Sequence, residues 1–218
     1  MRFFNSSLVP VLLLLSSCFS LGATTITVTG AGFGQDRVPI LTNNGTTLNR
    51  SYSGEILVMI NGKSQIAYCV DFFTGIGIGS YNSTFLSPAS YLNGARAAWI
   101  YEMNALTAVT NATAAAIQLA IWDVIHDGGD GLNAGNIRLS SSGSSSLRAA
   151  AEALISASAG RTSLNETILQ NTAFNGAPAQ WLITSGKLYP NTAVPEPTTW
   201  TMIAGGLGLG AWKRRRRR

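Results

Sequence analysis

The chain has 218 residues, with 15 basic and 10 acidic side chains, a net charge of +5 and an isoelectric point near 9.6. This basic balance is typical of nucleic-acid-binding proteins, but Arg2 and residues 213–218 supply almost half of the positive charge. Between Ala23 and Val194 the chain has 8 basic and 9 acidic residues, so this part is nearly neutral and we exclude nucleic acid as its partner. Its length suffices for one domain with a hydrophobic core.

The first 23 residues have the three parts of a secretory signal peptide. Arg2 supplies the positive start, residues 8–15 the apolar core, and residues 16–23 the small side chains before cleavage after Gly22 or Ala23. Residues 15–18 also match a bacterial lipobox, in which Cys18 would become the acylated first residue. We favour signal-peptidase cleavage over lipidation, because the chain carries a second membrane-directed segment at its other end.

The next region predicts β-structure. Residues 24–29 alternate and are β-branched, which indicates a strand, and residues 30–34 form a glycine-rich loop without the context of a phosphate site. Two apolar runs, 55–60 and 63–71, are joined by Asn-Gly, which predicts a hairpin with a type I′ turn. Alternation puts Cys69 and Asp71 on one face of the second strand, and Tyr68 on the other.

The middle of the chain changes to helical periodicity. Residues 75–79 and 81–87 are expected to be loops, and a Ser/Gly linker covers 140–146. Apolar residues at helical spacing predict three helices, and a strand is expected near the end of the domain: helices 90–103, 113–125 and 147–159, and strand 181–188. This order predicts an α+β fold, a β-sandwich or barrel-like domain with a helical insertion, over residues 24–190.

Cysteine usage singles out one side chain. The chain has two cysteines, and Cys18 lies in the signal region, so Cys69 is the lone thiol of the exported part. A lone thiol in an oxidising compartment forms no intramolecular disulfide, and it needs burial or another chemical fate.

Two segments together suggest what that fate is. Tyr68-Cys69-Val70-Asp71 and the later Ile117-Gln118-Leu119-Ala120-Ile121-Trp122 resemble the paired motifs of thioester domains in bacterial surface adhesins. The resemblance implies that Cys69 supplies the sulfur and Gln118 the acyl carbon of an internal thioester, with loss of ammonia. Trp122 lies one helical turn beyond Gln118 and is placed to shield the bond from water. Tyr68 and Trp99 are expected to add apolar cover.

Other interpretations of these residues stay open. Unpaired cysteines are commonly buried and inert, and a glutamine on an alanine-rich helix normally faces solvent. His126, the only histidine, lies among Asp123, Asp127 and Asp130, an arrangement that can bind a metal or exchange protons. A single histidine at a helix end more often caps the helix, so we expect no metal and no cofactor. The chain has no Gly-x-Ser-x-Gly motif, and a hydrolase or other enzyme is not expected.

The last 28 residues, 191–218, form a tripartite tail. Pro195-Glu196-Pro197 is followed by the apolar segment 198–212 and then by the basic residues 213–218. This order resembles the PEP-CTERM sorting signal of Gram-negative bacteria, in which an exosortase-type transpeptidase recognises the Pro-Glu-Pro site and removes the tail. The prolines keep the site extended, the apolar segment enters the bilayer, and the arginines stay on the cytoplasmic side. The segment is shorter than the roughly 20 residues of a full span, which favours a temporary hold.

These features predict an exported protein, at the cell surface or outside the cell of a Gram-negative bacterium, held transiently in the inner membrane by its tail. Its expected partners are signal peptidase, an exosortase-type transpeptidase and the membrane. Through the Cys69–Gln118 thioester, it would attach covalently to an amine or hydroxyl on a surface target, as an adhesin does. The alternative is a structural or glycan-binding protein of the exopolysaccharide or biofilm matrix, in which Cys69 is inert.

Overall fold

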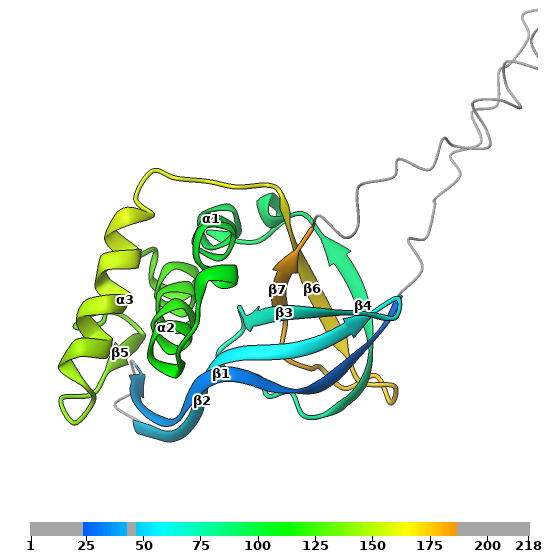
Figure 1. Cartoon of the computed structure of the whole chain (residues 1–218), viewed down its shortest axis with the longest axis horizontal. Coiled ribbons are helices and arrows are strands. Elements are labelled where there is room, and N and C mark those ends of the chain that lie inside the picture. Colours follow the sequence, from blue (N-terminus) through cyan, green and yellow to red (C-terminus); the bar gives the residue numbers. More distant parts are fainter. Residues whose placement is uncertain (1–23, 43–46, 187–218) are drawn as a thin grey trace, which may run out of the picture.

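The computed structural model of the chain describes residues 24–42 and 47–186 (Figure 1). The expected signal peptide, residues 1–23, and the expected sorting tail, residues 191–218, lie outside these residues. Within the described part, no helix has both the length and the apolar character needed to cross a membrane.

Among the described residues, six antiparallel strands close into a barrel. β1 pairs with both β2 and β4, so the strand order β1-β2-β3-β7-β6-β4 returns to its start, and a short strand, β5, pairs with the far end of β1. The bounds are β1 Thr24–Thr42, β2 Thr47–Ile60, β3 Lys63–Cys69, β4 Gly79–Leu86, β5 Ile137–Leu139, β6 Glu166–Thr172 and β7 Leu182–Ser185. The predicted α+β fold with a barrel-like sheet is confirmed.

The predicted hairpin is present as β2 and β3. Asn61 and Gly62 both have positive φ angles, 49° and 74°, which is the geometry that a type I′ turn requires. The turn sets the register so that Ile60 faces Lys63 and Ile56 faces Ala67. This register fixes where β3 ends, and the chain therefore leaves the sheet at Cys69.

The helical insertion lies between β4 and β6, and its three helices pack beside the barrel (Figure 1). They are α1 Gly94–Asn104, α2 Asn111–Asp127 and α3 Ser145–Ala157. The central helix α2 begins at a capping box of Thr110 and Thr113 and ends at Gly128, whose φ of 70° forms the left-handed cap. The other two helices and strands β1, β2 and β3 all contact α2, and consequently every residue from 114 to 125 is buried.

Two loop predictions are wrong. Residues 30–34 lie inside β1, where the register shifts between Ala31 and Gly34 mark an irregular pairing with β2. Added Cβ atoms at Gly32 and Gly34 would overlap the side chains of Glu55 and Tyr52, so these glycines allow the close approach of two strands. Residues 79–86 form β4 and not a loop, because this polar segment pairs with both β1 and β6. Ser83, a small side chain, is fully buried there.

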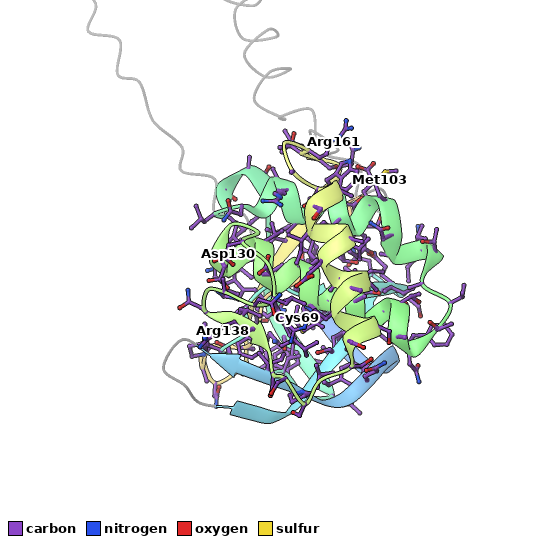
Figure 2. All side chains as sticks on the ribbon, turned by 90° about the vertical axis from the view of Figure 1, so that its left-hand side faces the viewer. Cys69, Met103, Asp130, Arg138 and Arg161 are labelled. Carbon is purple, nitrogen blue, oxygen red and sulfur yellow. The ribbon has the colours of Figure 1, made fainter. Side chains whose placement is uncertain are left out.

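The remaining expected elements agree with the structure in kind. Helices α1, α2 and α3 start or end within a few residues of the expected positions, and the last strand, β7, lies within the expected 181–188. Strands β5 and β6 were not expected. Figure 2 shows Cys69 inside the molecule and Asp130 in the loop after α2.

Candidate functional site

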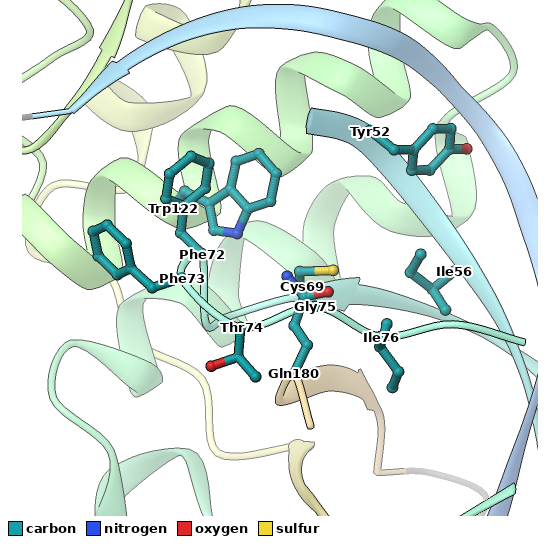
Figure 3. A pocket seen from close by; sticks show the side chains of 10 residues that line it. All are labelled: Tyr52, Ile56, Cys69, Phe72, Phe73, Thr74, Gly75, Ile76, Trp122 and Gln180. Atoms are coloured by element: carbon teal, nitrogen blue, oxygen red, sulfur yellow. The ribbon is translucent and has the colours of Figure 1, made fainter. Parts of the chain in front are cut away.

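Cys69 is the last residue of β3 and is buried, with 4% of its surface exposed. Its side chain faces a pocket of about 310 Å³, which Figure 3 shows from close by. The pocket is lined by the β2 residues Tyr52 and Ile56, by Trp122 of α2, by Gln180, and by the loop after β3, which contributes Phe72, Phe73, Thr74, Gly75 and Ile76. The thiol therefore lies at a recess that is lined by aromatic and aliphatic side chains together with polar groups.

Gln118 contacts Cys69 directly. Its Oε1 accepts the Cys69 backbone N–H at 2.8 Å, and its Nε2 donates to the Cys69 carbonyl oxygen at 2.7 Å. β2 pairs with β3 only as far as Ala67, so the carboxamide takes the next pairing position, which no strand fills. The side chain is fully buried, although a glutamine on such a helix would ordinarily face solvent. The structure thus brings together the two residues that the sequence motif pairs.

The electrostatic surroundings keep the thiol neutral. Burial raises the pKa of Cys69 well above its ordinary value of 9.0, and the nearby carboxylate of Asp71 raises it further. A thiolate is the stronger nucleophile, so Cys69 is a poor general nucleophile in this environment. The side chain that hydrogen-bonds to this residue, through the Cys69 backbone, is that of Gln118.

Trp122 and Phe72 form the apolar wall beside the thiol. Trp122 is 2% exposed, and its ring meets the Phe72 ring edge to face at 4.8 Å. No described residue accepts a hydrogen bond from the Trp122 indole nitrogen, although the nitrogen is buried. Figure 3 shows the indole and the Cys69 side chain facing the same recess, so Trp122 lies where the sequence motif places a shield.

The other two expected shielding residues lie elsewhere. Tyr68 points to the opposite face of β3, where its ring packs against Tyr101 at 6.1 Å, and it does not line the pocket. Trp99 lies half-buried on α1 and is likewise absent from the pocket lining. Strand alternation explains Tyr68, because neighbouring residues of a strand cannot point to the same face. Phe72 and Ile76 line the pocket instead.

The loop that follows β3 is fastened by two polar side chains. Gln180 donates from Nε2 to the Asp71 carbonyl oxygen at 2.6 Å, and its backbone N–H donates to the Gly75 carbonyl oxygen at 3.2 Å. His126 Nε2 accepts the Phe72 N–H at 3.3 Å, and its ring meets the Phe73 ring at 5.4 Å. Sequence reasoning missed Gln180, because nothing in its sequence context sets it apart.

His126 is a neutral support of this loop. Burial lowers its pKa, against opposing effects of Asp71 and Asp127, and its Nε2 is used as an acceptor. Gln118, Trp122 and His126 lie four residues apart on α2 and form one stripe along the helix. This stripe contacts Cys69 at the end of β3 and then Phe72 and Phe73 in the loop that follows, so one face of α2 borders the site.

The carboxylates that surround His126 in sequence gather without it. One oxygen each from Asp123, Asp127 and Asp130 lies within 4.8 Å of the others. Asp123 is fully buried, and burial raises its pKa to about 7. The imidazole is not part of this group, because it is turned toward Phe72.

Comparisons with known proteins identify the tail of the chain. The family model described as the PEP-CTERM protein-sorting motif matches residues 193–218, which include Pro195, Glu196 and Pro197. The chain is therefore an exported protein with a sorting signal of Gram-negative bacteria, which is processed by an exosortase and associates with the membrane through its C-terminal segment. A sequence comparison with curated proteins finds no match.

Among solved structures, the chain is similar to the N-terminal domain of the Streptococcus pyogenes pilus tip adhesin Cpa. The sequences are 14% identical, the TM-score is 0.40, and the match covers 72% of this chain and 97% of that chain. A likeness at this level assigns no role to any residue of this chain.

Proposed function

We propose that the exported domain, residues 24–190, forms an internal thioester between the Cys69 sulfur and the side-chain carbonyl carbon of Gln118. We further propose that this bond serves adhesin-like, covalent attachment to a surface partner. The observation that most supports the proposal is the pair of hydrogen bonds between the Gln118 carboxamide and the Cys69 backbone. They hold the acyl group against the residue whose sulfur must attack it, which is the positioning that an unreactive amide needs.

Formation of the bond balances without any further reactant. The Cys69 sulfur attacks the Gln118 carbonyl carbon, the bond from this carbon to Nε2 breaks, and the thiol proton leaves with the nitrogen as ammonia. The Cys69 N–H already donates to Oε1, where negative charge develops during attack. The hydrogen bond from Nε2 to the Cys69 carbonyl is lost with the ammonia. A buried, neutral thiol is compatible with this route, because its proton is used by the leaving group.

In attachment, the Cys69 sulfur would be the leaving group instead of the attacking group. An amine or hydroxyl on a partner enters the pocket and attacks the Gln118 acyl carbon, the carbon–sulfur bond breaks, and Cys69 recovers a proton from the attacking group. The product is an amide or ester that links the partner to Gln118. Phe73 at the pocket is 64% exposed, so the recess is reached from solvent past an aromatic side chain. Trp122 and Phe72 keep the inner part apolar, which slows hydrolysis.

One observation favours a second function, a matrix protein in which Cys69 is inert. Both polar groups of the Gln118 carboxamide already have hydrogen-bond partners, and burial raises the pKa of the Cys69 thiol. A buried and fully satisfied polar contact of this kind is stable without any covalent bond. In that case, Gln118 only fastens α2 to the end of β3.

The intact mass of the protein recovered from outside the producing cell, in amine-free buffer, separates the two functions. With a thioester, the protein weighs less than its processed sequence by one molecule of ammonia, resists alkylation of Cys69 while folded, and gains one methylamine when treated with it. Cys69→Ala and Gln118→Ala each remove the mass deficit and the methylamine adduct. Gln170→Ala, a half-buried glutamine of β6, is the matched control and keeps both.

A wild-type protein of full mass, with a Cys69 that alkylates readily in the folded state, would overturn the thioester and leave the matrix function. Peptide mapping of the same samples tests the proposed processing. We expect the mature chain to begin near Ala23 and to end close to Pro197. Extracellular protein that still carries Arg218 would contradict removal of the tail.

A further inference from the structure

The strongest unexplained feature of the molecule lies at the C-terminal end of α2, away from the pocket. Asp123 and Asp127 are on the last two turns of the helix, and Asp130 follows in the glycine-rich loop that Figure 2 shows at the surface. One oxygen of each carboxylate lies within 4.8 Å of the other two. Three negative charges at this separation repel one another unless a proton or a cation lies among them.

Asp123 is the member of this group that demands a partner. It is 0% exposed, and neither of its carboxylate oxygens has a hydrogen-bond partner among the described residues. The Gly131 backbone N–H is close enough to lower the Asp123 pKa, but it makes no hydrogen bond of acceptable geometry with either oxygen. Buried polar groups in proteins are nearly always paired, and an unpaired buried carboxylate is among the most costly. One oxygen of this side chain lies within 4.8 Å of an oxygen of each of the other two carboxylates.

The loop around the cluster is already held in shape. The Asp127 carboxylate accepts the backbone N–H groups of Asn136 and Ile137 at 2.8 and 2.7 Å, and it also accepts Asn136 Nδ2 at 2.7 Å. These bonds close the segment between residues 127 and 137 into a compact loop. Gly129 and Gly131 have positive φ angles of 83° and 94°, which few other residues adopt without strain. The carboxylates are therefore brought together by a preformed backbone.

The nearby cations are used elsewhere. The Arg96 guanidinium donates to the carbonyl oxygens of Gly128 and Ile155 and to the Ser158 hydroxyl, and it only moderates the charge at Asp123 from a distance. Arg148 donates to the carbonyl oxygens of Leu132 and Leu139 and to the side chain of Asn133. Among the described residues, neither arginine forms an ion pair with the cluster.

We propose that Asp123, Asp127 and Asp130 bind a divalent cation, and that this cation is calcium. All three donors are carboxylate oxygens, which hard cations prefer over nitrogen or sulfur ligands. Calcium tolerates irregular geometry and completes its shell with water and main-chain oxygens, whereas magnesium demands a near-ideal octahedron. An exported protein also meets calcium at the concentrations that such modest sites require. The site is independent of the thioester, and Cys69 takes no part in it.

Calcium titration of the exported protein after chelator treatment tests the proposal. We expect one calcium per chain by isothermal titration calorimetry, and a rise in Tm of about 5–10 °C at about 100 times the Kd. Asp130→Asn is the informative variant, because Asp130 is exposed and its replacement leaves the core untouched. We expect it to weaken calcium binding by at least about tenfold, since it removes one of three charged ligands.

Glu152→Gln is the matched control. Glu152 lies on α3 near the same loop, where Oε1 accepts a hydrogen bond from Asn133 at 2.9 Å, a bond that glutamine can keep. This variant should bind calcium like the wild type, and so should Cys69→Ala. The absence of stoichiometric binding at millimolar calcium would overturn the site. Wild-type affinity in Asp130→Asn, or binding of zinc in preference to calcium, would equally overturn it.

Discussion

Gln118 and Asp123 are two fully buried polar side chains on the same helix, less than two turns apart. They differ in their hydrogen bonding. Both polar groups of Gln118 are paired with the Cys69 backbone, at 2.8 and 2.7 Å. Neither oxygen of Asp123 has a hydrogen-bond partner among the described residues. The difference shows that burial alone says little about function, whereas the pairing of the buried group says a great deal.

The two side chains support different proposed chemistry, a covalent bond at Gln118 and cation binding at Asp123. The Gln118 contact is complete within the chain, so the proposed thioester would form from Gln118 and Cys69 alone. Neither oxygen of Asp123 is paired among the described residues, and the proposed calcium ion would come from solution to balance its charge. The two parts of α2 are thus a proposed internal reaction site and a proposed cation site. Removing the buried polar group should destabilise the protein at Gln118 and stabilise the ion-free protein at Asp123.

The largest effect is expected from Gln118→Ala in a Cys69→Ala background. That background excludes the thioester but keeps the backbone groups that Gln118 pairs. Removing the carboxamide leaves a buried N–H and a buried C=O unpaired, so we expect the free energy of unfolding to fall by about 2–5 kcal/mol. Urea unfolding measures it.

Gln170→Ala in the same background is the control, and a change within about 0.5 kcal/mol is expected for it. A loss at Gln118 no larger than this control would show that the contact contributes nothing to folding. The positioning on which the thioester depends would then be weak, and the comparison between the two parts of the helix would fail.

The sequence predicts the parts of this site that local rules determine. Asn61-Gly62 requires the turn that sets the register of β3 and thereby the end of the strand at Cys69. The helical spacing of Gln118 and Trp122 predicts that both face the same side of α2. The motif pairing of Cys69 and Gln118 therefore agrees in position with the structure, although the covalent bond itself stays a prediction.

The missed parts depend on contacts between distant segments. Tyr68 was expected to add apolar cover, although the alternation predicted for this strand already turns it away from Cys69, and in the structure it packs against Tyr101 of the distant helix α1. Phe72 reaches the thiol because His126, far along the chain, holds its backbone N–H. Strand β6 escaped prediction because its buried residues include the polar Glu166 and Asn171, which only the assembled domain buries.

At the C-terminal end of α2, Asp123→Asn is expected to stabilise the calcium-free protein. Asparagine removes the buried charge, and its amide can donate to the carboxylates of Asp127 and Asp130, which lie close by. We expect a gain of about 1–3 kcal/mol in the free energy of unfolding, measured at neutral pH with a chelator present. Saturating calcium should remove this advantage, because only the wild type gains stability from the ion. Lower stability of the variant in chelator would contradict an unpaired Asp123.

Glu55 on β2 is intermediate between Gln118 and Asp123, because only one of its two oxygens has a hydrogen-bond partner among the described residues. Its substitution is expected to have the smallest effect. It is 3% exposed, its Oε2 accepts the Phe33 N–H at 2.9 Å, and its Oε1 has no partner among the described residues. Burial raises its pKa above the ordinary 4.5, and the Phe33 N–H opposes this rise. A half-paired carboxylate should therefore cost the fold less than Asp123 does.

The pH dependence of Glu55→Gln tests this ranking. Because the pKa is raised in the folded state, the unfolded chain loses this proton first as the pH rises above 4.5, and the native state holds more protons there. The contribution of Glu55 to wild-type stability must then fall as the pH rises through the interval between its two pKa values, whereas the glutamine of the variant has no charge to gain. We expect the variant to match the wild type near pH 4 and to exceed it by no more than about 1 kcal/mol at neutral pH. Urea unfolding at both pH values measures the difference, with Glu152→Gln as the control. A variant that is less stable than the wild type at neutral pH would show that the hydrogen bond from the Phe33 N–H stabilises the Glu55 carboxylate by more than burial of its charge costs. One hydrogen bond would then be enough to keep a buried carboxylate charged.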